Sequence, residues 1–155
     1  MIRRGLLLGA LALAGCGFAP VYGTGGDAGA LRGAVRAADP DTQAGFEFVT
    51  RLEQRLGRPA APRYDLVWAF SDTEQALAID GSNEITRYNV EGTLVWRLEP
   101  AGGGAPVLEG TERSFTSYSA TASTISTLES ERDARDRLMR ILADAVVARL
   151  LAWAA

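Results

Sequence analysis

The chain has 155 residues, 47% of them hydrophobic, and a formal net charge of −3 from 16 basic and 19 acidic side chains. Every basic residue is an arginine, and the sequence contains no histidine and a single cysteine. These totals exclude catalysis by histidine, an internal disulfide and a zinc site built from cysteine or histidine. The acidic balance also argues against general nucleic-acid binding, which requires basic side chains to neutralise phosphates. The length suits one domain with one modest core.

The first residues have the composition of an export signal. Arg3 and Arg4 precede an apolar stretch at residues 5–13, and two small residues then lead to Cys16. This stretch is too short to span a bilayer, which requires about 20 apolar residues. The alternative is a soluble protein with an apolar N-terminal helix. We favour the signal because the basic start, the apolar run and the small residues before Cys16 occur together.

Residues 13–16, Leu-Ala-Gly-Cys, resemble the bacterial lipobox. The resemblance implies that the Cys16 thiol takes a diacylglyceryl group, that the chain is cleaved between Gly15 and Cys16, and that the freed amine is acylated. Three acyl chains would anchor the protein firmly, whereas one chain binds membranes only marginally. Gly17 replaces the aspartate that would mark inner-membrane retention, so we expect sorting to the outer membrane. The alternative for Cys16 is a small buried hydrophobic residue.

These features divide the chain into three predicted parts. Residues 1–15 form the signal peptide, and residues 16–30 form the lipidated N-terminus with a glycine-rich tether that docks at Phe18 and Tyr22. Residues 31–155 form a single domain. Removal of the two signal arginines leaves 14 arginines against 19 acidic residues, a net charge of −5.

The first half of the domain predicts one strand and one helix. Residues 30–37 are compatible with a short strand. Asp39 is the expected N-cap of a helix with Pro40 at its first position, and apolar residues follow at helical spacing. Gly57 marks the end of this helix.

Three antiparallel strands are expected next. Residues 64–71 alternate between apolar and polar, and the same strand continues to residue 79 after an irregularity near Asp72 and Thr73. Residues 87–98 show the clearest alternation in the chain. A glycine-rich loop at residues 100–106 leads to a strand at 107–119.

A long helix is predicted from about Leu128 to the end of the chain, with one broad apolar stripe. Val147 and Leu151 fall outside this stripe, so the last turns are either buried on two sides or covered by a partner. The predicted order is β-α-β-β-β-α. We therefore expect an α+β two-layer sandwich, with two helices on one face of a roughly four-stranded sheet.

Three groups of residues together resemble one family. The first is the lipobox followed by Cys-Gly-Phe and by Pro-Val-Tyr-Gly at residues 20–23. The second is the pair of strands at residues 87–98 and 107–111, and the third is the charged start of the last helix with its apolar continuation. Their order and spacing are similar to those of the LPS-assembly lipoproteins of the LptE type, in the alphaproteobacterial form.

The resemblance implies an outer-membrane lipoprotein on the periplasmic face. It would assemble with and plug an LptD-type β-barrel, the lipopolysaccharide (LPS) translocon, and support insertion of LPS into the outer leaflet. The expected partners are this barrel, LPS and, through the lipid anchor, the membrane. The resemblance implies neither a cofactor nor a catalysed reaction, and no nucleic-acid partner is expected.

Arg87, Arg97 and Arg113 are candidate LPS contacts. The first two lie on the polar face of one predicted strand and the third lies on its neighbour. Guanidinium groups can bind lipid A phosphates through paired hydrogen bonds. The alternative is a solvated face on which Glu91, Glu109 and Glu112 pair with these arginines.

Other conspicuous side chains are interpreted structurally. Trp68 and Trp96 are expected in the core, whereas Trp153 ends an apolar helix and could be open to a ligand. The acidic residues that begin the last helix are expected to pair with the arginines between them.

Two further classes of function remain as alternatives. One is a periplasmic lipid-binding or transporter-accessory lipoprotein that works without a barrel. The other, a small hydrolase, is disfavoured because the Ser/Thr-rich residues 116–127 have no histidine partner.

Overall fold

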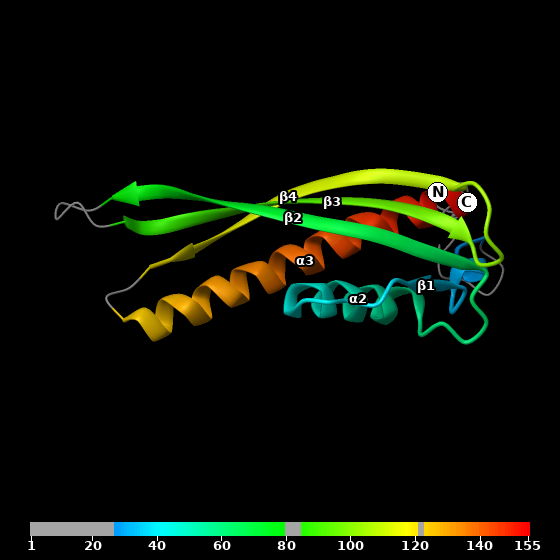
Figure 1. Ribbon diagram of the computed structural model, residues 1–155, viewed down its shortest axis with the longest axis horizontal. Helices are drawn as coiled ribbons and strands as arrows, with labels where there is room; N and C mark the ends of the chain where they lie inside the picture. Colours follow the sequence, from blue (N-terminus) through cyan, green and yellow to red (C-terminus); the bar gives the residue numbers. More distant parts are fainter. Residues whose placement is uncertain (1–26, 80–84, 121–122) are drawn as a thin grey trace, which may run out of the picture.

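The computed structural model describes residues 27–79, 85–120 and 123–155, and it has the predicted α+β architecture (Figure 1). Two helices pack on one face of a four-stranded sheet, and no described element covers the opposite face. The elements in chain order are η1 (Asp27–Leu31), β1 (Val35–Ala37), α2 (Gln43–Leu56), β2 (Tyr64–Ile79), β3 (Ile85–Pro100), β4 (Leu108–Ser119) and α3 (Thr124–Ala154).

The sheet is mixed, with the order β1-β2-β3-β4. The short β1 lies parallel to β2 and pairs only with residues 64–66. The three long strands are antiparallel, and their register places Trp68 opposite Trp96 and Trp96 opposite Gly110. This arrangement leaves β4 at one edge and most of β2 at the other.

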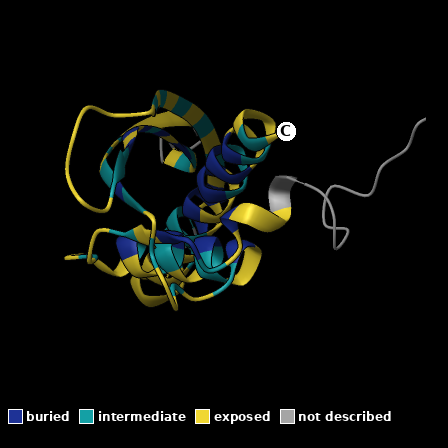
Figure 2. Ribbon diagram, turned by 90° about the vertical axis from the view of Figure 1, so that its right-hand side faces the viewer, coloured by how far each residue is buried: buried dark blue, intermediate teal, exposed yellow. Residues whose placement is uncertain are grey.

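The core lies between the sheet and the helices, as the alternating patterns predict. Val90, Leu94, Trp96 and Leu98 of β3 are buried on the inner face, and the odd-numbered side chains at 91, 95 and 97 are exposed on the outer face. The buried positions of α3 recur from Ala134 to Leu150, and Figure 2 shows them in dark blue on the turns of the helix. Trp96 is buried, whereas Trp68 is half-buried against Phe48 of α2, with the ring centroids 4.9 Å apart.

The predicted strand at residues 30–37 is largely wrong, because only residues 35–37 are extended. Gly33 has a φ of 66°, a left-handed conformation that favours glycine and interrupts the extended chain. Before it, η1 buries Leu31, and the N–H of Gly33 donates to the carbonyl of Leu56 at 2.7 Å.

The predicted N-cap of α2 is also wrong. Thr42, not Asp39, caps the helix, since its hydroxyl oxygen accepts a hydrogen bond from the N–H of Gly45 at 3.1 Å. The chain is still tied to the sheet before this point, because the N–H of Ala38 donates to the carbonyl of Leu66. The predicted end of the helix at Gly57 is confirmed.

The expected irregularity at Asp72 does not occur. The register of β2 with β3 is unbroken from Tyr64 to Ala76, and the shifts come between Ala76 and Ile79. Asp72 lies within the regular strand, and its carboxylate is paired with an arginine of α3.

The last helix begins at Thr124, one turn earlier than predicted. Serine and threonine obscure this turn in the sequence, but here their hydroxyls bond within the helix: Thr127 donates to the carbonyl of Ser123 and Ser130 to that of Ser126. At the other end, Val147 and Leu150 are fully buried and α3 also contacts η1, so the helix is buried within the domain on two sides as far as Leu150, whereas Ala152 and Trp153 are exposed. No helix in the described residues is both long and apolar enough to cross a membrane.

Candidate binding surfaces

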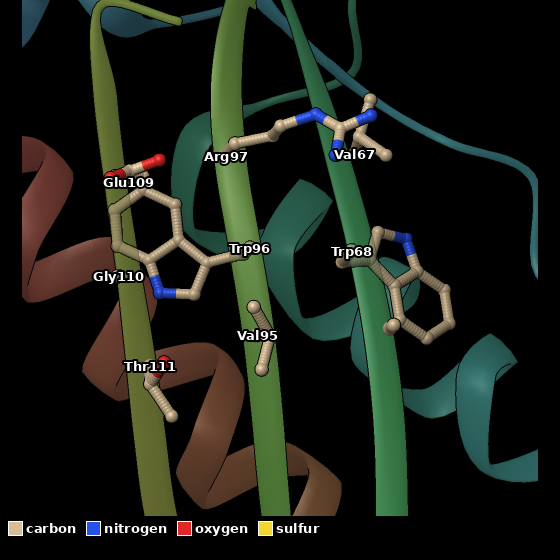
Figure 3. A pocket seen from close by; sticks show the side chains of 9 residues that line it. Val67, Trp68, Val95, Trp96, Arg97, Glu109, Gly110 and Thr111 are labelled. Atoms are coloured by element: carbon tan, nitrogen blue, oxygen red, sulfur yellow. The ribbon is translucent and has the colours of Figure 1, made fainter.

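The outer face of the sheet holds an open hollow of about 480 Å³, built on β2, β3 and β4 (Figure 3). Val67, Val95 and Thr111 are among the side chains that line it. Arg97 reaches across β2 beside Val67, its partner in the register. The guanidinium of Arg97 is ion-paired with Glu99, and Glu109 lies directly opposite on β4. Arg97 is therefore partly neutralised by neighbouring carboxylates.

A second outer hollow, of about 320 Å³, lies beside Arg113 on β4. Its lining includes Phe115, whose exposed fraction is 67%, and Glu91 on the neighbouring strand. Within the described residues Arg113 has no ion pair. This surface places the Arg113 guanidinium, which no described carboxylate pairs with, next to an exposed aromatic ring.

The third predicted arginine, Arg87, lies in a polar groove of about 300 Å³ between the sheet and α3. The groove is also lined by Arg137 of α3, which donates to the carbonyl of Ser117 at 3.2 Å and pairs with Asp133. No ion pair of Arg87 occurs within the part of the chain that the structure describes.

The structure does not bring Arg87, Arg97 and Arg113 into one cluster. Ten residues along β3 separate Arg87 from Arg97, which corresponds to roughly 33 Å in a strand. Arg113 lies opposite Thr93, between the two. One phosphate group cannot bridge these distances, so each arginine belongs to a different surface.

Glu112, which the sequence suggested as a partner of these arginines, faces the opposite way. Its side chain lies on the inner face with an exposed fraction of 13%. There it accepts a hydrogen bond from the indole N–H of Trp96 at 3.3 Å and pairs with Arg149 of α3 at 3.0 Å. Because Gly110 has no side chain, the Trp96 ring can lie across it; an added Cβ would meet the ring at 2.9 Å.

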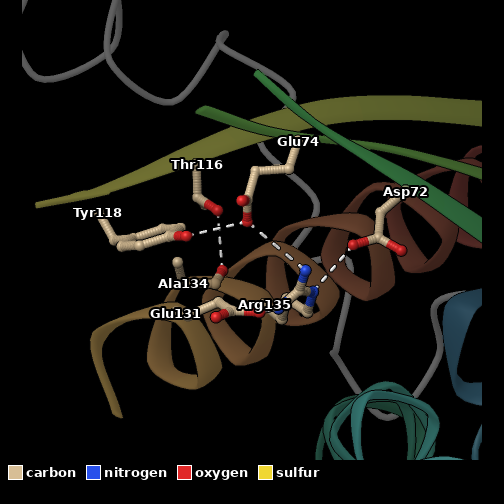
Figure 4. Close-up of polar contacts among 7 residues, drawn as sticks. All are labelled: Asp72, Glu74, Thr116, Tyr118, Glu131, Ala134 and Arg135. Carbon is tan, nitrogen blue, oxygen red and sulfur yellow. Dashed lines mark hydrogen bonds and ion pairs between the residues drawn. The ribbon is translucent and has the colours of Figure 1, made fainter. Parts of the chain in front are cut away.

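A polar cluster joins α3 to β2 and β4 on the inner face, beyond the apolar core (Figure 4). At its centre, Arg135 of α3 donates from Nε to Asp72 at 2.9 Å and pairs with Glu74 at 3.6 Å. It also forms an ion pair with Glu131, one turn earlier in the helix. One guanidinium thus holds three carboxylates from two elements.

Two further hydrogen bonds attach β4 to this cluster. The hydroxyl of Tyr118 donates to Glu74 at 3.0 Å, and that of Thr116 donates to the carbonyl of Ala134 at 2.8 Å. The Tyr118 ring stacks on Tyr88, with the centroids 5.2 Å apart. Burial and the hydrogen bond to Glu74 raise the pKa of the Tyr118 phenol.

The protonated state of Arg135 is strongly favoured. Burial lowers the pKa of its guanidinium, but the hydrogen bonds to Glu131 and Asp72 outweigh burial and raise the pKa overall. The sequence analysis missed Arg135 as a contact between layers. The available signal was its spacing from Leu138 and Leu142, which puts it on the buried stripe of α3.

The acidic residues at the start of α3 are paired as expected. Arg132 contacts Glu129 at 2.9 Å, and Arg137 contacts Asp133 one turn away. Burial, followed by the nearby charge of Glu47, raises the pKa of Asp136. The described residues contain no group of three or more side chains placed to hold a metal ion.

Trp153, at the end of α3, is 38% exposed and packs edge-on against Tyr64, with the ring centroids 5.6 Å apart.

Cys16 and Gly15, the predicted lipidation and cleavage residues, lie outside the described residues, as do Phe18 and Tyr22. The lipid anchor therefore stays a prediction.

The domain as a whole matches a family model. The model for LptE, described as lipopolysaccharide-assembly, matches residues 33–150, which include β1, α2, the three long strands and most of α3. The chain belongs to the LptE lipopolysaccharide-assembly family. The resemblance seen in the sequence is thus confirmed, and the chain is an LPS-assembly lipoprotein by family. A comparison with curated proteins found no match.

Solved structures share the fold of this LptE-family domain. A candidate lipoprotein from Caulobacter crescentus CB15 is 19% identical with a TM-score of 0.68, and the alignment covers 81% of this chain and 93% of that one. The rare lipoprotein B of Shewanella oneidensis is 9% identical with a TM-score of 0.58 (77% and 92% covered). A minor lipoprotein of Acinetobacter baumannii is 15% identical with a TM-score of 0.57 (77% and 89% covered).

Proposed function

We propose that this LptE-family chain is a lipid-anchored outer-membrane protein that assembles with and plugs the LPS translocon β-barrel. Working from the periplasmic face, it would support transport of LPS and its insertion into the outer leaflet, and it would catalyse no reaction. The observation that carries the proposal is the family match over residues 33–150, because it spans nearly the whole folded domain. The lipobox at Cys16 supplies the anchor that such a location requires.

The shape of the domain supports a role as a plug. It is elongated, with the long strands running along α3 (Figure 1). The outer face of the sheet, which no described element covers, offers surface to a larger partner, including the exposed Val95 and Phe115.

Co-purification tests this proposal against its alternative. The full-length lipoprotein, carrying a C-terminal tag, is isolated from detergent-solubilised membranes of the native host, and its partners are identified by mass spectrometry. We expect a stoichiometric complex with one large outer-membrane β-barrel. Recovery with an inner-membrane transporter alone would instead support a transporter-accessory lipoprotein without a barrel.

For LPS contact, the described surfaces favour Arg113 over Arg97. Among the described residues Arg113 has no ion-pair partner, and it lies beside exposed Phe115, so these two side chains could bind a phosphate and an acyl chain of an amphipathic lipid. Arg97 is already paired with Glu99. Arg87 stays a candidate within its groove beside Arg137.

We expect Arg113→Gln to weaken binding of purified LPS by about tenfold, which corresponds to the loss of one charge-assisted contact of about 1.4 kcal/mol. Arg97→Gln is the matched control, and it should change the affinity less than about threefold because it removes an already paired charge. Both side chains are exposed on the same face, so neither change should unfold the domain. Equal LPS affinities of both variants and the wild type would show that Arg113 is a solvated side chain and not an LPS contact.

A further inference from the structure

Within the described part of the chain, the edge of β2 is open over most of its length. β1 covers only residues 64–66, after which the chain turns away through Pro40 to the start of α2. Beyond Leu66, β3 is the one strand among the described residues that pairs with β2. Residues 73–77 are all exposed, and the far end of β2 extends past α2 in Figure 1.

The hydrogen bonds to the β1 segment identify the backbone groups that point away from β3. The N–H of Tyr64 donates to the carbonyl of Ala34 at 3.0 Å, and the carbonyl of Leu66 accepts from Ala38 at 2.9 Å. In a strand the backbone N–H and C=O groups of successive residues point alternately to the two neighbouring strands. Because the register is regular up to Ala76, the backbone groups of later even-numbered residues also point away from β3. The outward N–H and C=O groups are those of Trp68, Phe70, Asp72, Glu74 and Ala76. Among the described residues no backbone group bonds to them.

The charged side chains along this edge, Asp72 and Glu74, point to the inner face, where Arg135 pairs with both. The outer-face side chains along it are Ser71, Thr73 and Gln75, which are neutral, and no proline or bulge occurs before Ala76. The opposite edge, β4, is protected. It carries the charged Glu109 and Arg113 on the outer face. The carbonyl of Ser117 already accepts a hydrogen bond from Arg137 of α3, so it is not free to pair with another strand.

We propose that the open β2 edge binds an extended segment of the translocon barrel protein as an additional strand. This inference rests on the proposed function. Main-chain hydrogen bonds would supply the affinity, and side chains on alternate positions the specificity.

The charges along the edge favour a different protein over a second copy of this chain. Two copies paired over the whole open edge would place Asp72 opposite Asp72 of the second copy, and like charges directly opposite each other are destabilising. A segment with neutral or basic residues at the positions facing Asp72 and Glu74 avoids this repulsion. The expected occupant is therefore an extended, non-acidic segment of the barrel.

Proline at residue 76 tests the inference. Ala76→Pro removes an outward N–H and leaves the bonds to β3 in place, since proline is tolerated at edges where the N–H faces solvent. Ala76→Val is the matched control, because it adds a side chain of similar size and keeps the N–H. We expect Ala76→Pro to reduce the barrel recovered with the tagged full-length lipoprotein by about tenfold, with Ala76→Val unchanged.

A cross-linking measurement makes the test independent of any folding defect of the proline variant. A photoreactive phenylalanine analogue is placed at Gln75 on the open edge or at Ser117 on β4; both lie on the outer face opposite Asn89. We expect cross-links to the barrel from Gln75 and not from Ser117.

Each outcome decides the question. Wild-type recovery of the barrel with Ala76→Pro, together with equal cross-linking from both positions, would overturn the edge inference and leave the plug proposal standing. Absence of the barrel from the wild-type preparation would overturn the plug proposal itself. A wild-type dimer that Ala76→Pro converts to a monomer would identify a second copy as the occupant and contradict the inference.

Discussion

Arg135 links α3 to the inner face of the sheet at the point where the apolar core ends. Leu138 and Leu142 follow it on the same stripe of α3, but the strands opposite Arg135 present Asp72 and Glu74 in place of apolar side chains. A partly buried cation among three carboxylates is held by charge-assisted hydrogen bonds, which are stronger than neutral ones. The distal part of the sheet is therefore attached to α3 by polar contacts.

Arg135→Met should destabilise the domain by about 1–3 kcal/mol, because it keeps the length of the side chain and leaves the carboxylates without their common partner. Urea unfolding followed by circular dichroism measures the change. Arg132→Met is the control: Arg132 pairs with Glu129 where both side chains are about two-thirds exposed, and such pairs contribute at most about 1 kcal/mol. Equal losses in the two variants would contradict the role assigned to Arg135.

Tyr118 should make stability depend on pH in alkaline solution. Burial and Glu74 raise the pKa of its phenol above the ordinary 10.0, so the unfolded chain loses this proton at a lower pH than the folded protein. The contribution is complete below pH 10 and is lost as the pH rises above it. Tyr118→Phe should cost about 0.5–1.5 kcal/mol at neutral pH, and its difference from the wild type should narrow above pH 10.

Unfolding free energies of both proteins from about pH 8 to about pH 11 measure this effect. Thr116→Val is the control, since it removes the neighbouring bond to Ala134 without removing an ionisable group. A difference between wild type and Tyr118→Phe that stays constant with pH would contradict the pKa assignment.

At the scale of elements, the two helix starts differ in how they are determined. Thr42 has an extended conformation, with φ −128° and ψ 158°, and a direct cap bond to Gly45. Ser123, which precedes α3, makes no such side-chain bond. The start of α2 is thus determined by one hydroxyl, whereas that of α3 depends on contacts along the helix.

Thr42→Ala should destabilise the domain by about 1 kcal/mol through loss of this cap, and Asp39→Ala should change it by less than about 0.5 kcal/mol. Thermal unfolding of both variants provides the comparison. The opposite order would restore Asp39 as the N-cap.

Elements with strong periodicity could be predicted from the sequence, and contacts between distant segments could not. The alternation of β3 and the stripe of α3 identify their buried faces, because burial of one side imposes the period. The bounds of β1 do not follow from the sequence because this short strand depends on contacts with β2, such as the hydrogen bond from the N–H of Tyr64 to the carbonyl of Ala34 just before β1. The Arg135 cluster joins residues 63 positions apart, and nothing local indicates that Asp72 faces α3.

At the scale of the whole molecule, the two ends of the elongated domain are built from different elements. η1 and the C-terminal turns of α3 lie at the same end (Figure 1). β2 runs away from that end over 16 residues, or about 50 Å in a strand. Cys16, the predicted lipidation residue, precedes Asp27 by eleven residues. A chain of this length spans at most about 40 Å. The open part of the β2 edge thus extends away from the end at which η1, the first described element, lies.

The predicted anchor at Cys16 can be tested directly. We expect Cys16→Ala to incorporate no labelled fatty acid and to accumulate as a precursor that retains residues 1–15, because only a thiol at this position can accept the diacylglyceryl group. Gly17→Asp is the matched variant: it should be lipidated and cleaved normally but remain in the inner membrane. Mass spectrometry of the N-terminus and membrane fractionation distinguish the two outcomes. A Cys16→Ala protein that is still lipidated and still reaches the outer membrane would exclude the lipobox as the source of the anchor.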